Sequence, residues 1–178
     1  MQEFRLASYC GLYCGACEIV VAYRKGLAAH TVPQWEDQPD PIRKNLKRAK
    51  IQCLGCKTDT VFQGCAICPV RKCARNKPEI ETCLDCVRFP CFRFSLIKFV
   101  RKFLGYDRKL PHLKTIPENQ GLIREKGVSA WLAEQQKKWQ CPDCPTAFAW
   151  YQTQCSACGK ELDTPGNFIQ GTKVCKQG

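Results

Sequence analysis

Apolar residues recur at helical spacing in four stretches of the chain. Residues 18–29 follow a loop and place Ile19 and Val20 on one expected helix face. A second helix is predicted to begin at Asp40 and Pro41, because aspartate can cap a first turn and proline fits inside it. The IRKNLKRAKIQ that follows mixes basic and apolar residues at the same spacing, which predicts an amphipathic basic helix.

Two further helices are predicted in the second half of the chain. FRFSLIKFVRKFLGY, residues 92–106, carries an aromatic and apolar stripe, and Gly105 can end its helix. Residues 118–138 form the other helix, which we expect to be broken or bent near Gly127. There is little sign of extended strands before residue 140. We expect the stripe to pack in the core, with a partner groove as the alternative; it consists of Phe92, Leu96, Phe99, Val100 and Phe103.

The sixteen cysteines change this picture, because they fall in two groups. Eleven lie between Cys10 and Cys91, and four lie between Cys141 and Cys158, with Cys175 expected to be a free thiol in the tail. This distribution predicts a small, irregular α+β fold stabilised by metal, in which a mostly helical cysteine-rich part precedes a zinc ribbon of short β-strands. The expected domains are a metal-binding domain over 1–106, a helical linker over 107–138, and the ribbon with its tail over 139–178.

The second cysteine group has the spacing of a tetrahedral metal site. Cys141 and Cys144 form one C-x2-C turn, and Cys155 and Cys158 form another after ten residues. Two such turns on facing β-hairpins supply the four sulfur ligands that Zn²⁺ prefers. The spacer FAWYQTQ alternates as a strand does, so the segment resembles a rubredoxin-type zinc ribbon. Structural Zn²⁺ is the expected occupant, and iron on the same four thiolates is the alternative.

The first group contains a repeat. CAICPVRKC and CLDCVRFPC share the spacing C-x2-C-x4-C at an offset of 18 residues, and both place proline beside a cysteine, as ferredoxin-like cluster loops do. The earlier YCGLYCGAC has the C-x3-C-x2-C spacing of radical enzymes, but the chain lacks the strand–helix repetition of their barrels. We therefore expect these cysteines to join later ones in sites closed across the sequence. The expected ligands are Cys10, Cys14, Cys17, Cys53, Cys56, Cys65, Cys68, Cys73, Cys83, Cys86 and Cys91.

The number of these cysteines leaves the metal open. Eleven thiolates exceed the eight that two cuboidal clusters need and fall one short of the twelve that three zinc sites need. His30 or a carboxylate could supply the twelfth ligand, although His30 and His112 are each expected to be surface or core residues. Both [4Fe–4S] clusters and Zn²⁺ remain candidates for the N-terminal domain, and free or disulfide-bonded cysteines are the third possibility.

The formal charge of +12 points to an anionic partner or to the metal sites themselves. Four thiolates on Zn²⁺ or on a [4Fe–4S]²⁺ cluster leave a charge of about −2 per site, so three filled sites would lower +12 to about +6 and four to about +4. The predicted basic helix is expected to be a solvated face, with nucleic-acid or partner binding as the alternative. Its cations are Arg43, Lys44, Lys47, Arg48 and Lys50.

The start of the chain lacks the basic start and long apolar core of a signal peptide, and no window has the length of a membrane span. These features predict a cytoplasmic protein with no membrane partner. Thiols stay reduced in that compartment, where C-x2-C spacing favours metal binding over disulfides.

The cysteine segments together resemble a known family. CGLYCGAC, CLGC, the C-x2-C-x4-C spacing and ETCLDCVRFPCFRF are similar to DUF3795, a family of small cysteine-rich proteins common in anaerobic bacteria and archaea. The resemblance covers roughly residues 8–95, and the family's motif cysteines fall on all eleven N-terminal positions. GVSAWLAEQQKKWQCPDC and the ribbon behind it are similar to an extension that some members carry. The resemblance implies a metal-binding domain without an established activity.

Three hypotheses for function follow, and none rests on a catalytic motif, since no P-loop, GxGxxG or HExxH is present. The first is a metal–thiolate protein acting in electron transfer, iron–sulfur chemistry or redox sensing. The second is a zinc-stabilised adaptor for nucleic acid or protein, in which Phe148, Trp150 and Tyr151 could stack bases, although such aromatics usually pack within the ribbon. The third is an enzyme whose cluster has one open iron. We favour the first, in which the chain is not a stand-alone enzyme.

Overall fold

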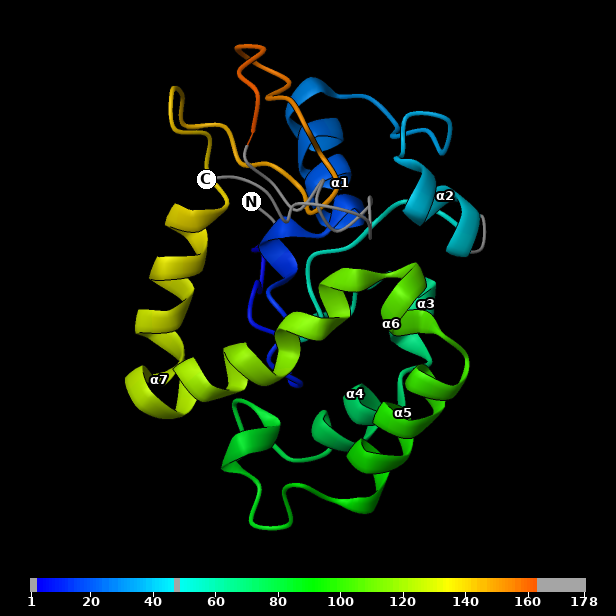
Figure 1. The fold of residues 1–178 in the computed structure, drawn as a ribbon, viewed down its shortest axis with the longest axis vertical. Coiled ribbons are helices and arrows are strands. Elements are labelled where there is room, and N and C mark those ends of the chain that lie inside the picture. Colours follow the sequence, from blue (N-terminus) through cyan, green and yellow to red (C-terminus); the bar gives the residue numbers. More distant parts are fainter. Residues whose placement is uncertain (1–2, 47–48, 163–178) are drawn as a thin grey trace, which may run out of the picture.

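The computed structural model describes residues 3–46 and 49–162. Within these residues the chain is mostly helical, as predicted, and its strand pairing consists of isolated antiparallel bridges. The helices follow one another through Figure 1 from the blue N-terminal part to the yellow α7. In chain order they are η1 (Cys14–Ala16), α1 (Glu18–Ala29), α2 (Asp40–Asn45), α3 (Gln63–Ala66), α4 (Pro69–Ala74), η2 (Cys83–Asp85), α5 (Phe92–Phe103), α6 (Tyr106–Lys109), η3 (Pro111–Thr115) and α7 (Ile116–Lys138).

Helix α1 has the predicted bounds, whereas α2 is shorter than predicted. α2 begins at Asp40 with proline in its first turn, but Leu46 adopts extended angles (φ −107°, ψ 144°) and ends it. The side chains of Arg43 and Lys44 both bond to Asp40 on the same helix, which is consistent with a solvated face. Lys47 and Arg48 lie outside the described residues.

Helix α7 bends where the sequence predicted a break. Gly127 has φ 80° and ψ 165°, a conformation that side chains with a Cβ rarely adopt. The two arms of α7 therefore run in different directions, as the sharp corner of the yellow-green helix in Figure 1 shows. Ile123 before the bend and Val128 after it are both buried, so each arm packs on the core.

One hydrophobic core joins the three predicted parts of the chain. Trp131 on α7 is fully buried, and its ring meets that of Tyr13 edge-on with centroids 6.1 Å apart. Ile19 on α1 and Trp150 from the C-terminal part belong to the same buried cluster. The linker helix thus packs against both its neighbours, while the domain boundaries themselves stay a prediction.

The apolar stripe of α5 is not in the core, so that expectation was wrong. α5 faces the protein through its other side, where the Phe94 ring packs on Phe89 with centroids 4.9 Å apart and Arg101 pairs with Asp107 at 2.6 Å. The partner groove offered as the alternative stays a prediction. The exposed fractions of the stripe are 78% for Phe92, 45% for Leu96, 66% for Phe99, 42% for Val100 and 77% for Phe103.

No helix in the described part of the chain has the length and apolar character needed to cross a membrane.

The C-terminal part forms two cysteine turns, each closed by one antiparallel bridge. Gln140 bridges to Ala147 around the first turn, and Gln154 bridges to Glu161 around the second. The short β-strands predicted for the ribbon are thus reduced to single bridges over residues 139–162. The remainder of the predicted ribbon domain, including Cys175, lies outside the described residues.

Candidate metal centre

The two C-terminal turns bring four sulfurs together. The Sγ atoms of Cys141 and Cys158 lie 3.6 Å apart, those of Cys144 and Cys155 lie 3.5 Å apart, and all four lie within 4.8 Å of one another. Four thiolates around one Zn²⁺ at about 2.3 Å would be about 3.8 Å apart, so the observed spacing fits a single tetrahedral ion. The predicted set of ligands in this part is therefore assembled in space and could hold a metal ion.

Backbone amides prepare the second turn for a thiolate. The N–H groups of Cys158 and Ala157 are directed at the Cys155 sulfur and lower the pKa of this thiol to about 6. Backbone bonds also close both turns, from Cys141 N to the Thr146 carbonyl oxygen over 2.9 Å and from Cys155 N to that of Lys160 over 2.8 Å. Burial and the hydrogen bonds with Cys155, Cys141 and Cys144 raise the pKa of Cys158 to about 12, so only one of the two sulfurs in this turn is ionised before a metal binds.

The turns are fixed to the N-terminal part by buried contacts. Trp150 N donates to the Ala16 carbonyl oxygen over 2.9 Å, and Tyr151 N donates to Glu18 Oε1 over 2.7 Å. Burial raises the pKa of the Glu18 carboxyl to about 8. These contacts place α1 beside the orange C-terminal segment in Figure 1. The aromatics Phe148, Trp150 and Tyr151 are buried, so they pack within the protein and offer no surface on which bases could stack.

Neither histidine lies in the metal site. His112 is buried, stacks on Trp150 with ring centroids 3.8 Å apart, and shares a 2.7 Å hydrogen bond between Nδ1 and the Tyr151 hydroxyl. It is a core residue, one of the two roles that the sequence predicted. His30 is exposed at the end of α1 with φ 53°.

Cysteines from three segments that are distant in the sequence lie near one another beside the start of α1. The first segment contributes Cys14, in η1, and Cys17, at the N-cap of α1. The second contributes Cys53 and Cys56, and the third contributes Cys65. Burial, followed by the charges of Cys56, Cys17 and Cys65, raises the pKa of Cys14 well above its ordinary value. Burial, the Glu18 charge and then that of Cys53 raise the pKa of Cys17 to about 12. The structure thus brings the predicted segments together, while their ligation of metal stays a proposal.

These buried sulfurs need a cation to become ligands. Burial, followed by the charge of Cys10, raises the pKa of Cys56 to about 12, so without a metal this thiol is neutral at physiological pH. A bound metal ion supplies the positive charge that stabilises the ionised form of such thiols, and each thiol releases its proton when the metal binds. The N-terminal segments therefore have the donor chemistry of metal ligands, in a setting where thiolate without metal is unfavourable.

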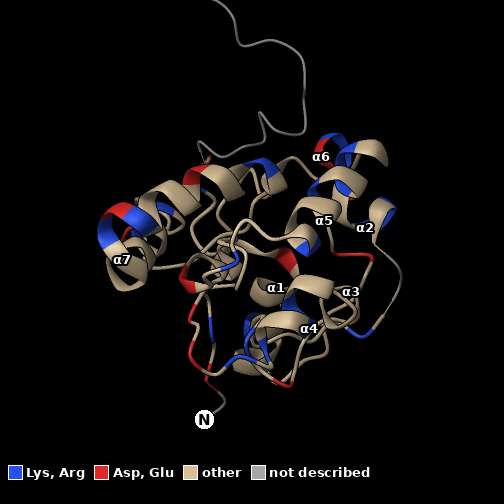
Figure 2. Cartoon of the chain, turned by 90° about the horizontal axis from the view of Figure 1, so that it is seen from below, with Lys and Arg blue, Asp and Glu red and all other residues tan. Residues whose placement is uncertain are grey.

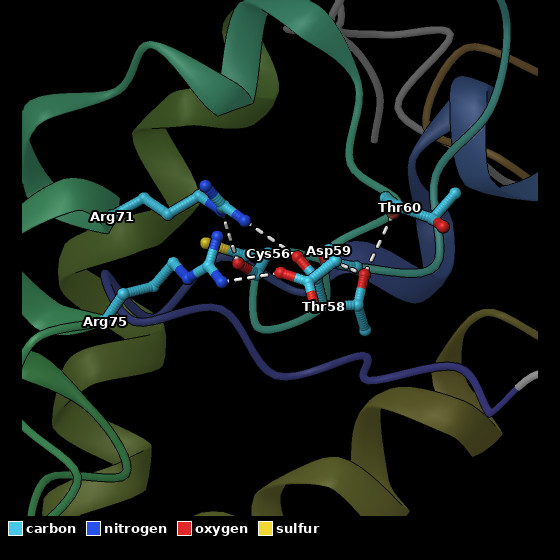
Figure 3. Close-up of polar contacts among 7 residues, drawn as sticks. Cys56, Thr58, Asp59, Thr60, Arg71 and Arg75 are labelled. Atoms are coloured by element: carbon cyan, nitrogen blue, oxygen red, sulfur yellow. Dashed lines mark hydrogen bonds and ion pairs between the residues drawn. The ribbon is translucent and has the colours of Figure 1, made fainter.

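Arg71 is a positioning residue that the sequence did not reveal. It is 5% exposed on α4, and its Nε and Nη2 donate to the carbonyl oxygens of Cys56 and Thr58 over 2.8 and 2.7 Å. Figure 3 shows both bonds, together with the ion pair from Arg75 to Asp59 on the same loop. The loop is also fixed at Gly55, where φ is 116° and an added Cβ would lie 1.9 Å from the Arg5 carbonyl oxygen.

The last four N-terminal cysteines lie around a separate cavity of about 520 Å³. It opens between α4, η2 and the start of α5. One of its cysteines, Cys86, accepts a hydrogen bond from Lys77 Nζ over 3.1 Å. The four cysteines that line it are Cys73, Cys83, Cys86 and Cys91.

Residues 6–96 match the model of a family described as "Protein of unknown function (DUF3795)". This match spans just over half of the 178-residue chain. The chain belongs to the DUF3795 family. The match covers all eleven N-terminal cysteines of this DUF3795 protein and ends before the C-terminal turns, whose ribbon character no family match supports. No curated protein and no solved structure matches the chain.

Proposed function

We propose that this DUF3795 protein is an intracellular metal-binding protein that holds several thiolate-ligated sites. In this proposal Cys141, Cys144, Cys155 and Cys158 hold one Zn²⁺, and the eleven N-terminal cysteines hold [4Fe–4S] clusters, Zn²⁺, or both. The metal sites act in electron transfer, iron–sulfur chemistry or redox sensing. The observation that carries the proposal is the set of four C-terminal sulfurs within 4.8 Å of one another.

The N-terminal part supports the same conclusion by its chemistry. Its thiols are gathered from segments far apart in the sequence and are half-buried or buried, apart from Cys65, which is exposed. Cys17, Cys68 and Cys91 stand at the N-caps of α1, α4 and α5, where backbone amides of the first turn are free to donate to a metal-bound sulfur. A metal would stabilise the folded state by binding these thiolates.

The test is anaerobic purification followed by quantification of iron, zinc and sulfide and by an absorption spectrum. The C-terminal site is expected to contribute about one zinc ion per chain, which Cys144→Ser loses. Cys175→Ser is the matched control, because Cys175 is predicted to be a free thiol, and it keeps the full metal content. A protein that binds neither iron nor zinc after anaerobic purification and reconstitution would refute the proposal.

A further inference from the structure

The cavity beneath α5 is lined by cysteines from three different elements. Cys73 lies in α4, Cys83 begins η2, Cys86 follows η2 as its C-cap, and Cys91 is the N-cap of α5. This arrangement joins the last cysteine of the first C-x2-C-x4-C repeat to all three cysteines of the second. The cavity measures about 520 Å³. The cavity lining thus includes cysteines from both copies of the repeat.

Backbone contacts hold these cysteines around the cavity. Cys83 N donates to the Tyr9 carbonyl oxygen over 2.7 Å, which ties η2 to the N-terminal segment. The η2 turn is locked by a capping box, in which Asp85 accepts from Thr82 N over 2.6 Å and the Thr82 hydroxyl accepts from Leu84 N over 3.2 Å. Two sulfurs of the set, those of Cys83 and Cys86, are thus presented by a rigid turn.

The charges around the cavity suit an anionic group. Among the described residues that line it, the charged side chains are Lys72, Lys77, Arg88 and Arg93, and none is acidic. Figure 2 shows the same excess of Lys and Arg over Asp and Glu on α4 and α5. A [4Fe–4S]²⁺ cluster with its four thiolates carries a charge of about −2, which these cations would balance. Phe89, Phe92 and Phe94 add an apolar wall.

The spacing of the sulfurs favours a cluster over a single ion. Within the described chain, the C-terminal turns are the one set of three or more ligand side chains whose donor atoms all lie within 4.8 Å. The four cysteines around the cavity do not form such a set, and the cavity that they line measures about 520 Å³. A cavity of this size suits a cuboidal cluster, which attaches each thiolate to a different iron atom and occupies more space than one ion.

We propose that Cys73, Cys83, Cys86 and Cys91 together hold one [4Fe–4S] cluster in the cavity between α4, η2 and α5. The proposal rests on the proposed metal-binding function and says which thiolates form one site. Each thiol gives up its proton when it binds iron. Of the eleven N-terminal cysteines, seven then remain, so they cannot complete two further sites with four sulfurs each. The seven are Cys10, Cys14, Cys17, Cys53, Cys56, Cys65 and Cys68.

The test uses the full chain, prepared anaerobically and reconstituted with ferric iron, sulfide and a thiol reductant, which supplies the two electrons that a [4Fe–4S]²⁺ cluster needs. Cys73→Ser and Cys91→Ser are each expected to lose about four iron and four sulfide ions per chain, with the matching part of the cluster absorption. Cys175→Ser is the control, since Cys175 is predicted to be a free thiol, and it keeps this iron.

The outcomes separate this proposal from the metal-binding function. Unsubstituted protein without iron or zinc would refute both. Iron that both Cys73→Ser and Cys91→Ser retain would leave the metal-binding function standing and overturn the grouping. A zinc-only protein that loses one zinc ion in each variant would overturn the cluster.

A second variant keeps every cysteine and covers the case in which a cysteine variant does not fold. Lys77→Met removes both a positive charge and the hydrogen bond to Cys86 Sγ, so the midpoint potential of the cluster is expected to become more negative. Arg75→Met is the control, because Arg75 pairs with Asp59 and does not line the cavity, and its potential stays unchanged. Equal potentials in Lys77→Met and the unsubstituted protein would overturn the placement of the cluster.

Discussion

The Arg71 guanidinium group donates to the carbonyl oxygen of Cys56 over 2.8 Å and so joins two cysteine segments. Arg71 lies between Cys68 and Cys73 on α4, whereas Cys56 belongs to the CLGC loop. Arg71 also donates a second hydrogen bond, of 2.7 Å, to the Thr58 carbonyl oxygen, so one side chain binds the loop at two points. The position of the CLGC sulfurs relative to α4 therefore depends on a buried side chain that binds no metal itself.

Arg71→Met is expected to destabilise the protein by about 2–4 kcal/mol, because two carbonyl oxygens lose their donor inside the protein. Anaerobic urea unfolding measures this change, and metal content is expected to fall with it. Arg75→Met is the matched control at the C-cap of α4. Its partner Asp59 is 90% exposed, so the change there is expected to stay within about 0.5 kcal/mol. Equal losses of unfolding free energy in the two variants would show that the burial of Arg71 does not determine its contribution to stability.

Removal of metal is expected to loosen the C-terminal turns while the aromatic residues around them become hydrated. Trp139 and Trp150 are 5% and 3% exposed and flank the first turn. Without the metal ion the four cysteines are no longer linked to one another, so the turns loosen and water reaches the two rings. A chelator that removes the ion should therefore shift tryptophan emission to longer wavelength. The variant with both Trp139→Phe and Trp150→Phe should show little of this shift. An unchanged emission maximum after complete metal loss would contradict the structural role of the ion.

Local signals in the sequence predicted the local elements of the fold. The bounds of α1 and the bend of α7 at Gly127 follow from apolar spacing and from one glycine, and both are confirmed. The spacing of the C-terminal cysteines likewise predicted that their sulfurs would meet. These features depend on residues close together in the chain, where periodicity and turn chemistry carry most of the information.

Contacts between distant residues could not be predicted in this way. The role of Arg71 depends on carbonyl groups 13 and 15 positions away, which no periodicity reveals. The grouping of Cys73 with the second repeat depends on how α4 packs beside α5. The prediction that the stripe of α5 lies in the core failed for the same reason. Amphipathic spacing shows that a helix has an apolar face, but it does not show which part of the protein, if any, covers that face.

Substitutions in that stripe are expected to have little effect on stability. Phe99 and Phe103 are 66% and 77% exposed, so Phe99→Ser and Phe103→Ser should each change the free energy of unfolding by no more than about 0.5 kcal/mol. Phe94→Ala on the opposite face is the comparison, and it is expected to cost about 2 kcal/mol because its ring packs on Phe89. Urea unfolding measures all three. A large loss in Phe99→Ser would mean that the stripe is covered in solution.

The last prediction concerns the buried His112. Burial, followed by the positive charge of Arg101, lowers the pKa of this imidazole to about 3 from its ordinary value of 6.5. Between these two pH values the unfolded chain holds a proton on this residue that the folded protein does not. The contribution of neutral His112 to stability is therefore present above pH 6.5 and is lost as the pH falls, by up to about 1.4 kcal/mol per pH unit.

His112→Gln should remove this dependence, and the measurement is the difference in unfolding free energy between variant and unsubstituted protein from pH 7 to about pH 5. Using the difference cancels the acid release of thiolate-bound metal, which both proteins share. Tyr151→Phe is the control, since it deletes the 2.7 Å bond to Nδ1 but keeps the titrating ring, and it is expected to lower stability while retaining the slope. Parallel pH profiles for His112→Gln and the unsubstituted protein would show that His112 is not held neutral by its burial beside Trp150.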